Sequence, residues 1–149
     1  ADYFDDHKLM CGLTYSGHPL ACAAGIATLD VYKEEKLVER SKAMGKILGQ
    51  IEEELKRKHP CVEDVRYKGL FSAIELVKDK ETKEPLVEYN KDPENIMGGI
   101  IGVLKKKGFS TYSHENNIIV APPLIITETE LRDAMAIMDE VLADVDAMI

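Results

Sequence analysis

The chain has 149 residues, of which 45% are apolar and 31% are charged, so it is long enough to fold around a hydrophobic core. Its formal net charge of -8 argues against a nucleic acid as a partner. No apolar run reaches the length of a membrane span and the first residues, ADYFDDHK, lack the features of a signal peptide, so we expect a cytoplasmic protein with no membrane partner. Three cysteines without CxxC spacing, Cys11, Cys22 and Cys61, are expected to be reduced and mostly buried.

Two helices are predicted in the first part of the chain. Pro19 suits the first position of a helix, and apolar residues follow it at helical spacing to about Glu35. A second, amphipathic helix ends at His59-Pro60, and we interpret its lysine and glutamate runs as a solvated face. Its apolar stripe consists of Met44, Ile47, Leu48, Ile51 and Leu55.

After Pro60 the pattern changes to that of strands. Residues 62–66 and 69–77 carry alternating or continuous apolar residues, which predicts two neighbouring antiparallel strands. The polar segment 78–90, KDKETKEPLVEYN, is expected to be a long exposed loop. Pro93 is then expected to open a third helix, and Gly108 to end it.

A hairpin and a long helix are predicted for the last part of the chain. Two short apolar runs, 109–112 and 118–120, are joined by the turn-like HENN of residues 114–117. Thr127 and Glu130 match a capping box, and an apolar stripe at helical spacing follows them to the C-terminus.

This order of elements predicts an α+β fold, in which helices cover a small, mostly antiparallel sheet. The first helix is separated from the strands by the whole second helix. We therefore expect it to pack on something other than this sheet, which need not lie in this chain.

Three strings carry a resemblance to a known family. GLTYSGHPLACAAGIATLD (12–30), VEDVRYKGLFSAIEL (62–76) and NNIIVAPPLIITETEL (116–131), in this order and at these intervals, resemble the C-terminal part of class III pyridoxal-phosphate-dependent aminotransferases. The resemblance covers residues 11–142. It implies the C-terminal small domain of a fold type I enzyme, preceded by a long interdomain helix. Residues 1–36 would form a phosphate-contact segment with the connecting helix, and residues 37–149 the small α+β domain.

In the first string, the resemblance implies that Thr14 contacts the phosphate of pyridoxal phosphate across a homodimer interface. Hydroxyls and backbone amides at a helix N-terminus suit a dianionic phosphate. The alternative is that Thr14 and Ser16 only satisfy backbone groups ahead of the helix. Leu13 matches a position that borders the substrate pocket of the neighbouring subunit, and is otherwise a packed leucine. His18 is interpreted as structural, because its ring can bond the backbone at the helix start.

The second and third strings concern the substrate. Arg66 stands in VRYKGL, and the resemblance implies a bidentate pair with a substrate carboxylate, the alternative being a strand-end arginine on a solvated surface. The family's second arginine, expected before APPL, is missing from FSTYSHENN, where Tyr112 sits near its place. With one cation fewer, we expect a small monocarboxylate acceptor such as pyruvate. Glu75 is interpreted as part of a solvated face or a structural pair.

The lysine that holds the cofactor covalently lies, in this family, upstream of the TYSGHP string in the large domain, and Lys8 is in the wrong context for it. We therefore expect this chain to be the C-terminal part of a transaminase that moves an amino group between an amine or amino acid and a keto acid, and to be inactive alone. A non-catalytic α+β interaction module is the alternative. An aminomutase of the same family is a third possibility, but that branch typically carries asparagine where His18 stands.

Overall fold

The structure is a computed structural model, and it describes residues 2–149. These residues form two compact units, of which the first ends at Lys36 and the second spans residues 37–149. None of the described helices is both long and apolar enough to cross a membrane.

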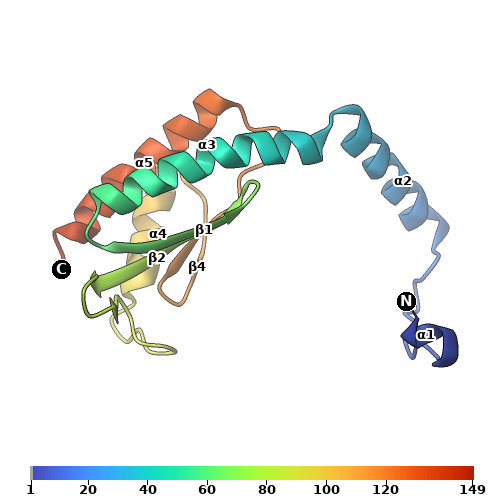
Figure 1. The fold of residues 1–149 in the computed structure, drawn as a ribbon, viewed down its shortest axis with the longest axis horizontal. Coiled ribbons are helices and arrows are strands. Elements are labelled where there is room, and N and C mark those ends of the chain that lie inside the picture. The colour runs from blue at the N-terminus through green and yellow to red at the C-terminus, as the bar shows by residue number, and fades with distance from the viewer. Residues whose placement is uncertain (1) are drawn as a thin grey trace. The chain divides into compact units, whose positions relative to one another are not determined.

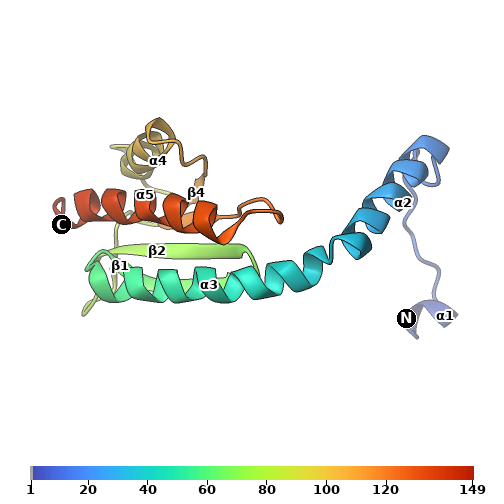
Figure 2. The same cartoon turned by 90° about the horizontal axis from the view of Figure 1, so that it is seen from above.

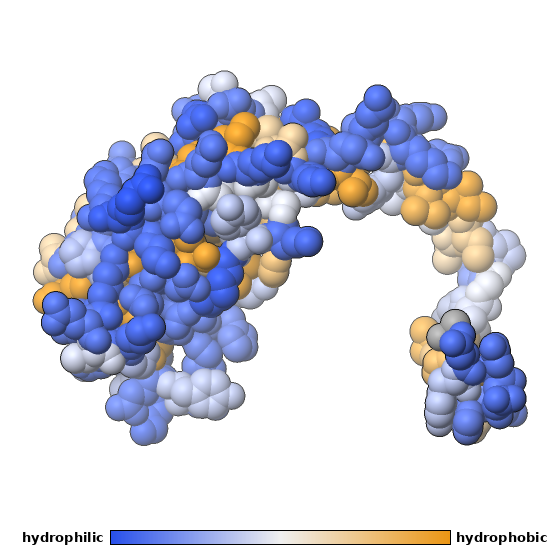
Figure 3. All heavy atoms as spheres, viewed as in Figure 1, coloured by the Kyte–Doolittle hydropathy of each residue, from blue (hydrophilic) through white to orange (hydrophobic). Residues whose placement is uncertain are grey.

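The first unit contains α1 (Tyr3–Asp6) and α2 (Pro19–Glu34), and no residue of either helix is buried. Pro19 occupies the first turn of α2, as predicted. The exposed apolar side chains Leu20, Ile26 and Leu29 are spread around the circumference of α2 rather than on one stripe. Figure 3 shows hydrophobic surface on this part of the chain. A helix that is apolar on several sides is typical of one that is enclosed by other protein.

The second unit is an α+β layer, which confirms the predicted fold class. Helices α3 (Leu37–Lys58) and α5 (Glu128–Asp146) lie side by side over one face of the sheet, and α4 (Ile96–Lys106) packs against α5 (Figures 1 and 2). The strands are β1 (Val62–Lys68), β2 (Phe71–Asp79), β3 (Glu84–Pro85), β4 (Ser113–His114) and β5 (Asn117–Val120). Their order is β1-β2-β5-β4, with β3 paired to β2, and every pairing is antiparallel.

The core lies between the sheet and its helices. On β2, Ser72, Ile74 and Leu76 face the helices and are buried, because alternate residues of a strand point to the same face. The helices contribute large apolar side chains to the same cluster, among them Leu48, Leu55, Leu104, Leu131, Met135, Met138 and Leu142. The capping box predicted at Thr127 and Glu130 is present at the start of α5.

Three predicted boundaries were wrong. Segment 78–90 is not wholly exposed, because it contains β3 and because Leu86 and Val87 are buried against the core. Helix α4 begins at Ile96 rather than Pro93, since the carboxylate of Asp92 accepts bonds from the backbone amides of Ile96 and Met97 at 2.7 and 3.0 Å. The hairpin exists, but its first strand is β4 rather than residues 109–112.

Tertiary contacts explain the last difference. The Thr111 hydroxyl donates to the carbonyl of Ile119, and Phe109 packs against the core, so this stretch approaches β5 without a regular ladder. The expectation for the cysteines was also wrong in part, because Cys61 is buried whereas Cys11 and Cys22 are exposed.

Candidate functional site

The segment ahead of α2 is a tight turn. The backbone amide of Ser16 donates to the carbonyl of Leu13 at 2.9 Å, and the amide of His18 donates to the carbonyl of Tyr15 at 3.1 Å. Gly17 has a φ of +75°, a conformation that side-chain-bearing residues rarely adopt. The Ser16 hydroxyl accepts a bond from the amide of Leu13 at 3.3 Å, so this serine stabilises the turn itself.

The Thr14 hydroxyl has no hydrogen-bond partner among residues 2–149, and Thr14 is exposed. His18 is the residue that precedes α2, and its side chain makes no cap bond; its ring instead lies tilted against that of Tyr15, with centroids 5.7 Å apart. Within the described part of the chain, the predicted bond from the His18 ring to the backbone is therefore not found. A hydroxyl and the first amides of a sixteen-residue helix are left facing outward, and such donors fit a phosphate group.

Arg66 lies on the face of the sheet opposite α3 and has a dense set of partners. Its Nη1 atom donates to Glu75 at 2.5 Å and to Asp64 at 3.0 Å, and its Nη2 donates to Asn117 at 2.6 Å. The bond to Glu75, with that to Asp64, raises the pKa of Arg66. Asp64 also accepts a bond from Lys56 at 2.9 Å, and this bond, with that from Arg66, lowers the pKa of its carboxyl.

The sheet register explains this cluster. Arg66 is opposite Ala73, and Glu75 is opposite Asn117, so a diagonal across β1, β2 and β5 brings the three polar side chains together. Glu75 is thus a structural pair, one of the two roles predicted for it. The Arg66 side chain is still 51% exposed, which leaves it accessible to a ligand.

The other two predicted substrate residues are exposed. Leu13 is 76% exposed, so it is not a packed leucine in this chain, and Tyr112 is 59% exposed. Tyr112 directly precedes β4, and its carbonyl accepts a bond from the amide of Ile119 at 3.1 Å. Because Asn117 of the same hairpin bonds Arg66, the structure brings Arg66 and the hairpin that follows Tyr112 into one unit.

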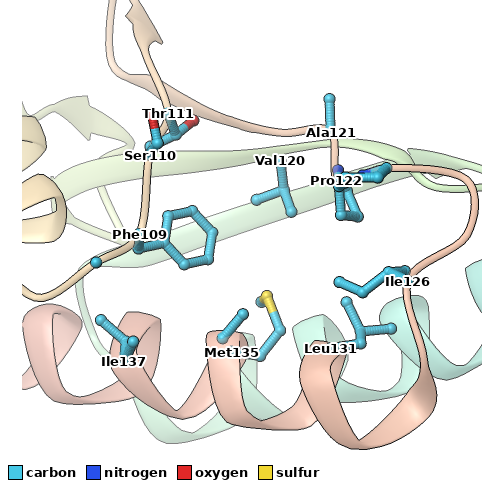
Figure 4. Close-up of a pocket in the computed structure, with 13 residues that line it drawn as sticks. Phe109, Ser110, Thr111, Val120, Ala121, Pro122, Ile126, Leu131, Met135 and Ile137 are labelled. Atoms are coloured by element: carbon cyan, nitrogen blue, oxygen red, sulfur yellow. The ribbon is translucent and has the colours of Figure 1, made fainter.

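A cavity of about 220 Å³ lies between the loop before β4, the end of β5 and α5. Figure 4 shows Phe109, Val120 and Met135 pointing into it, with Pro122 at its edge. Its polar lining residues are Ser110 and Thr111. This cavity could not be predicted from the sequence, because its walls come from three separate segments, within residues 108–111, 120–126 and 131–137, that only tertiary packing brings together.

The structural roles of Arg40 and Glu52 were not predicted from the sequence either. The guanidinium of Arg40 donates to the carbonyls of Leu124, Ile125 and Ile126, at 3.0, 3.0 and 2.7 Å, and so fixes the segment that follows APPL. Glu52, assigned to a solvated face, is fully buried. Neither could be found from local spacing, because the partners of each lie on elements that are distant in sequence.

Comparison with known proteins decides the family. The family model described as class-III aminotransferase matches residues 5–142. The chain belongs to the class III aminotransferases.

Solved and curated relatives agree. The structure superposes with a TM-score of 0.89 on a taurine:2-oxoglutarate aminotransferase from Bifidobacterium kashiwanohense, solved in complex with pyridoxal phosphate and glutamate; the two are 46% identical over 98% of this chain and 32% of that one. An ornithine aminotransferase from Bacillus cereus is 41% identical over 89% of this chain and 29% of its own length. An ethanolamine-phosphate phospho-lyase homolog from Caenorhabditis elegans is 36% identical over 87% of this chain and 27% of its own length.

The chain thus spans about a third, or less, of the length of these relatives. The comparisons confirm the predicted family and the small domain of a fold type I enzyme, for which pyridoxal phosphate is the cofactor. They give no support to the non-catalytic module.

Proposed function

We propose that this chain supplies the small-domain part of a pyridoxal-phosphate-dependent transaminase, which moves an amino group between an amine or amino acid and a keto acid. The likeness to the Bifidobacterium aminotransferase carries the proposal, because 46% identity extends over 98% of the chain at a TM-score of 0.89. The bound cofactor supplies an electron-withdrawing ring that stabilises negative charge on the substrate carbon. The lysine that holds the cofactor is assigned to the large domain of the intact enzyme.

Thr14 is the residue that we propose to bind the cofactor. Its hydroxyl has no partner among the described residues, and it precedes a helix whose first amides face outward. Both kinds of donor stabilise a phosphate dianion, and the positive end of the helix dipole adds to them. The role of these residues is to hold and orient the phosphate, while proton transfer falls to groups outside this chain.

We further propose that the intact enzyme is a cytoplasmic homodimer, with Thr14 and Leu13 of one subunit placed at the active site of the other. The apolar circumference of α2 supports an enclosing partner, since none of its residues is buried within residues 2–149. Two parts of the intact enzyme can cover this helix: the large domain of the same subunit and the second subunit.

For the substrate carboxylate we propose Arg66, with Tyr112 and Leu13 bordering the pocket. Arg66 already has two carboxylate partners, so a substrate must share the guanidinium with Glu75 and Asp64 or displace one of them. A guanidinium has five N–H donors, and two of its nitrogens account for the three bonds present. The exposed part of the side chain is where a further carboxylate would bind.

Two observations point to different acceptors. Tyr112 stands where a second arginine was expected, which favours pyruvate. The Bifidobacterium relative is named for 2-oxoglutarate and was solved with glutamate. We propose 2-oxoglutarate as the acceptor. An identity of 46% over nearly the whole chain includes more of the residues that this chain supplies to the pocket than the single side chain of Tyr112 does.

The test is a direct assay of the intact enzyme with pyridoxal phosphate. Amine donors, taurine and ornithine among them, are offered with 2-oxoglutarate or with pyruvate, and glutamate or alanine is quantified. We expect glutamate to form. Alanine alone would overturn the choice of acceptor, and release of inorganic phosphate from an amino-alcohol phosphate without amino transfer would overturn the transaminase itself.

A further inference from the structure

Glu52 is a carboxyl group inside the core of the second unit. It lies on α3, its side chain is 0% exposed, and its nearest polar partner is Ser72 of β2, which is 1% exposed. The Ser72 hydroxyl donates to Oε1 of Glu52. The other oxygen, Oε2, is buried and has no hydrogen-bond partner among the described residues.

The packing around Glu52 leaves little room for solvent. One stripe of α3 lies directly on the strands, because a Cβ on Gly45 would collide with the backbone of Gly69, and one on Gly49 would collide with the ring of Tyr67. Glu52 follows on the same stripe, one turn further along α3. Two glycines therefore bring helix and sheet together at the place where the carboxyl group is buried.

No cation compensates this carboxyl group among residues 2–149. On its own helix the nearest charges are Glu53, which has the same sign, and Lys56, whose ammonium bonds Asp64 at 2.9 Å. On β1 the titratable residue on this face is Tyr67, whose ring lies against Gly49; Asp64, to which Lys56 donates, lies on the opposite face with Glu75 and Arg66.

The remaining elements of the layer are apolar where they are buried. β2 contributes Ser72 as its only buried polar residue, β5 contributes Ile118 and Val120, and α5 contributes leucines, methionines and valines. An ionised Glu52 would thus be a buried charge without a counterion, which is strongly unfavourable.

We propose that Glu52 is a neutral carboxylic acid in the folded protein, and that its proton makes the attachment of α3 to the sheet sensitive to pH near neutrality. A neutral carboxyl group keeps the bond to Ser72. Protonation leaves only one polar group of Glu52, a hydroxyl or a carbonyl oxygen, without a hydrogen-bond partner. This costs far less free energy than a buried charge without a counterion. The proposal concerns the fold of residues 37–149 and is independent of the transaminase activity.

The direction of the pH effect follows from the ionisation of the two states. Burial raises the pKa of Glu52 from 4.5 to about 7, the bond from Ser72 opposes this rise, and the charge of Glu53 adds to it. Folding therefore takes up a proton at each pH at which Glu52 is ionised in the unfolded chain but protonated in the folded chain. The contribution of Glu52 to stability is fully present below pH 4.5 and is lost as the pH rises through about 7.

The experiment compares melting temperatures of the chain with those of Glu52→Gln, at pH values from about 5 to about 8. Glu53→Gln is the matched control, because it removes the same charge from the neighbouring, exposed position. We expect the melting temperature of the parent and of Glu53→Gln to fall by several degrees across this range. Glu52→Gln should remain flat, and a slope equal to that of the parent would overturn the proposal.

Two further measurements cover the case in which Glu52→Gln does not fold. Ser72→Ala removes the bond that favours the ionised form, so the pH midpoint of the melting-temperature change should move upward. Infrared spectra of the parent at about pH 6 should show the carbonyl band of a protonated carboxyl group, which disappears as the pH rises through about 7. A folded parent without this band at pH 6, or a Ser72→Ala midpoint that moves downward, would contradict a neutral Glu52.

Discussion

At the scale of single residues, Thr14 carries the proposal for the cofactor. Its hydroxyl is not needed by the turn, whose bonds come from Ser16 and from the backbone. A structural and a binding role are therefore divided between two neighbouring residues: Ser16 stabilises the turn, and Thr14 offers its hydroxyl to a ligand. This separation makes Thr14 suitable for a substitution that leaves the fold unchanged.

The first prediction concerns the variant Thr14→Val in the intact enzyme. Loss of a hydrogen bond to a charged phosphate should weaken cofactor binding by roughly 1.5 to 3 kcal/mol. Equilibrium dialysis of pyridoxal phosphate measures this loss, and Thr14→Ser, which keeps the hydroxyl, is the control. An affinity equal to that of the parent would leave Thr14 without a role at the phosphate.

The second prediction concerns Arg66→Gln. In the intact enzyme it should raise KM for the carboxylate-bearing substrate while cofactor affinity stays the same, because it removes a bidentate donor and leaves the phosphate contact intact. Arg66→Lys should rescue KM poorly, since an ammonium cannot form the planar pair. Arg132→Gln is the control, because Arg132 is an exposed arginine that pairs with Glu128 within α5.

Steady-state kinetics with 2-oxoglutarate and with pyruvate check this prediction. If Arg66→Gln leaves KM unchanged for every acidic substrate, Arg66 is confined to its structural network with Asp64, Glu75 and Asn117. That result would favour the solvated strand-end arginine over the substrate contact.

At the scale of elements, α3 and α5 are joined by a buried histidine. His59 is 2% exposed; its Nδ1 lies 2.5 Å from Asp146 and its Nε2 lies 2.7 Å from Asp139, both on α5. The backbone amide of Cys61 donates to the same Asp146 at 3.0 Å. The chain that leaves α3 is thus anchored to the last helix on both sides of the histidine ring.

The third prediction is that His59→Gln destabilises the second unit by roughly 1 to 3 kcal/mol, because it removes hydrogen bonds that link the chain after α3 to two partly buried carboxylates of α5. Bonds from Lys58 and His59 lower the pKa of Asp139; burial acts to raise that of Asp146, but the bonds from Cys61 and His59 outweigh it and lower the pKa. The contribution of both carboxylates is present above their unfolded value of 3.8 and is lost as the pH falls through the lower folded values.

Acid unfolding followed by circular dichroism measures this effect. The parent should unfold at a lower pH than His59→Gln does, because the two carboxylates lose their histidine partner in the variant. His114→Gln is the control, since His114 is exposed in the hairpin. Equal acid midpoints for the parent and His59→Gln would show that the histidine does not stabilise these carboxylates.

The same elements show what the sequence could predict. Helices α2, α3 and α5 and the capping box of α5 were predicted correctly, because a 3.6-residue period, a proline at the helix start and a Thr-Glu pair are local signals. The burial of Glu52, Leu86 and Val87 was not, because it depends on packing between distant elements. Likewise, Thr14 and Arg66 were selected through a resemblance of motifs, whereas the partners of Arg66 on β2 and β5 required the sheet register.

At the scale of the whole molecule, the chain supplies about a third of the length of its solved relatives. Its first unit buries none of the residues of α1 or α2, whereas its second unit has a well-packed core. This contrast fits our proposal that the first unit is completed by a large domain and a second subunit. The second unit, in contrast, has the internal contacts of a domain that can fold by itself.

The most direct test of the central claim is amino transfer by the intact enzyme supplied with pyridoxal phosphate. With 2-oxoglutarate and an amine or amino-acid donor, we expect glutamate to form, and we expect Thr14→Val to shift this activity to higher cofactor concentration. Dependence on the cofactor links the chemistry to the residue that this chain contributes. A well-folded, cofactor-loaded enzyme that transfers no amino group from any donor to 2-oxoglutarate or to pyruvate would contradict the claim.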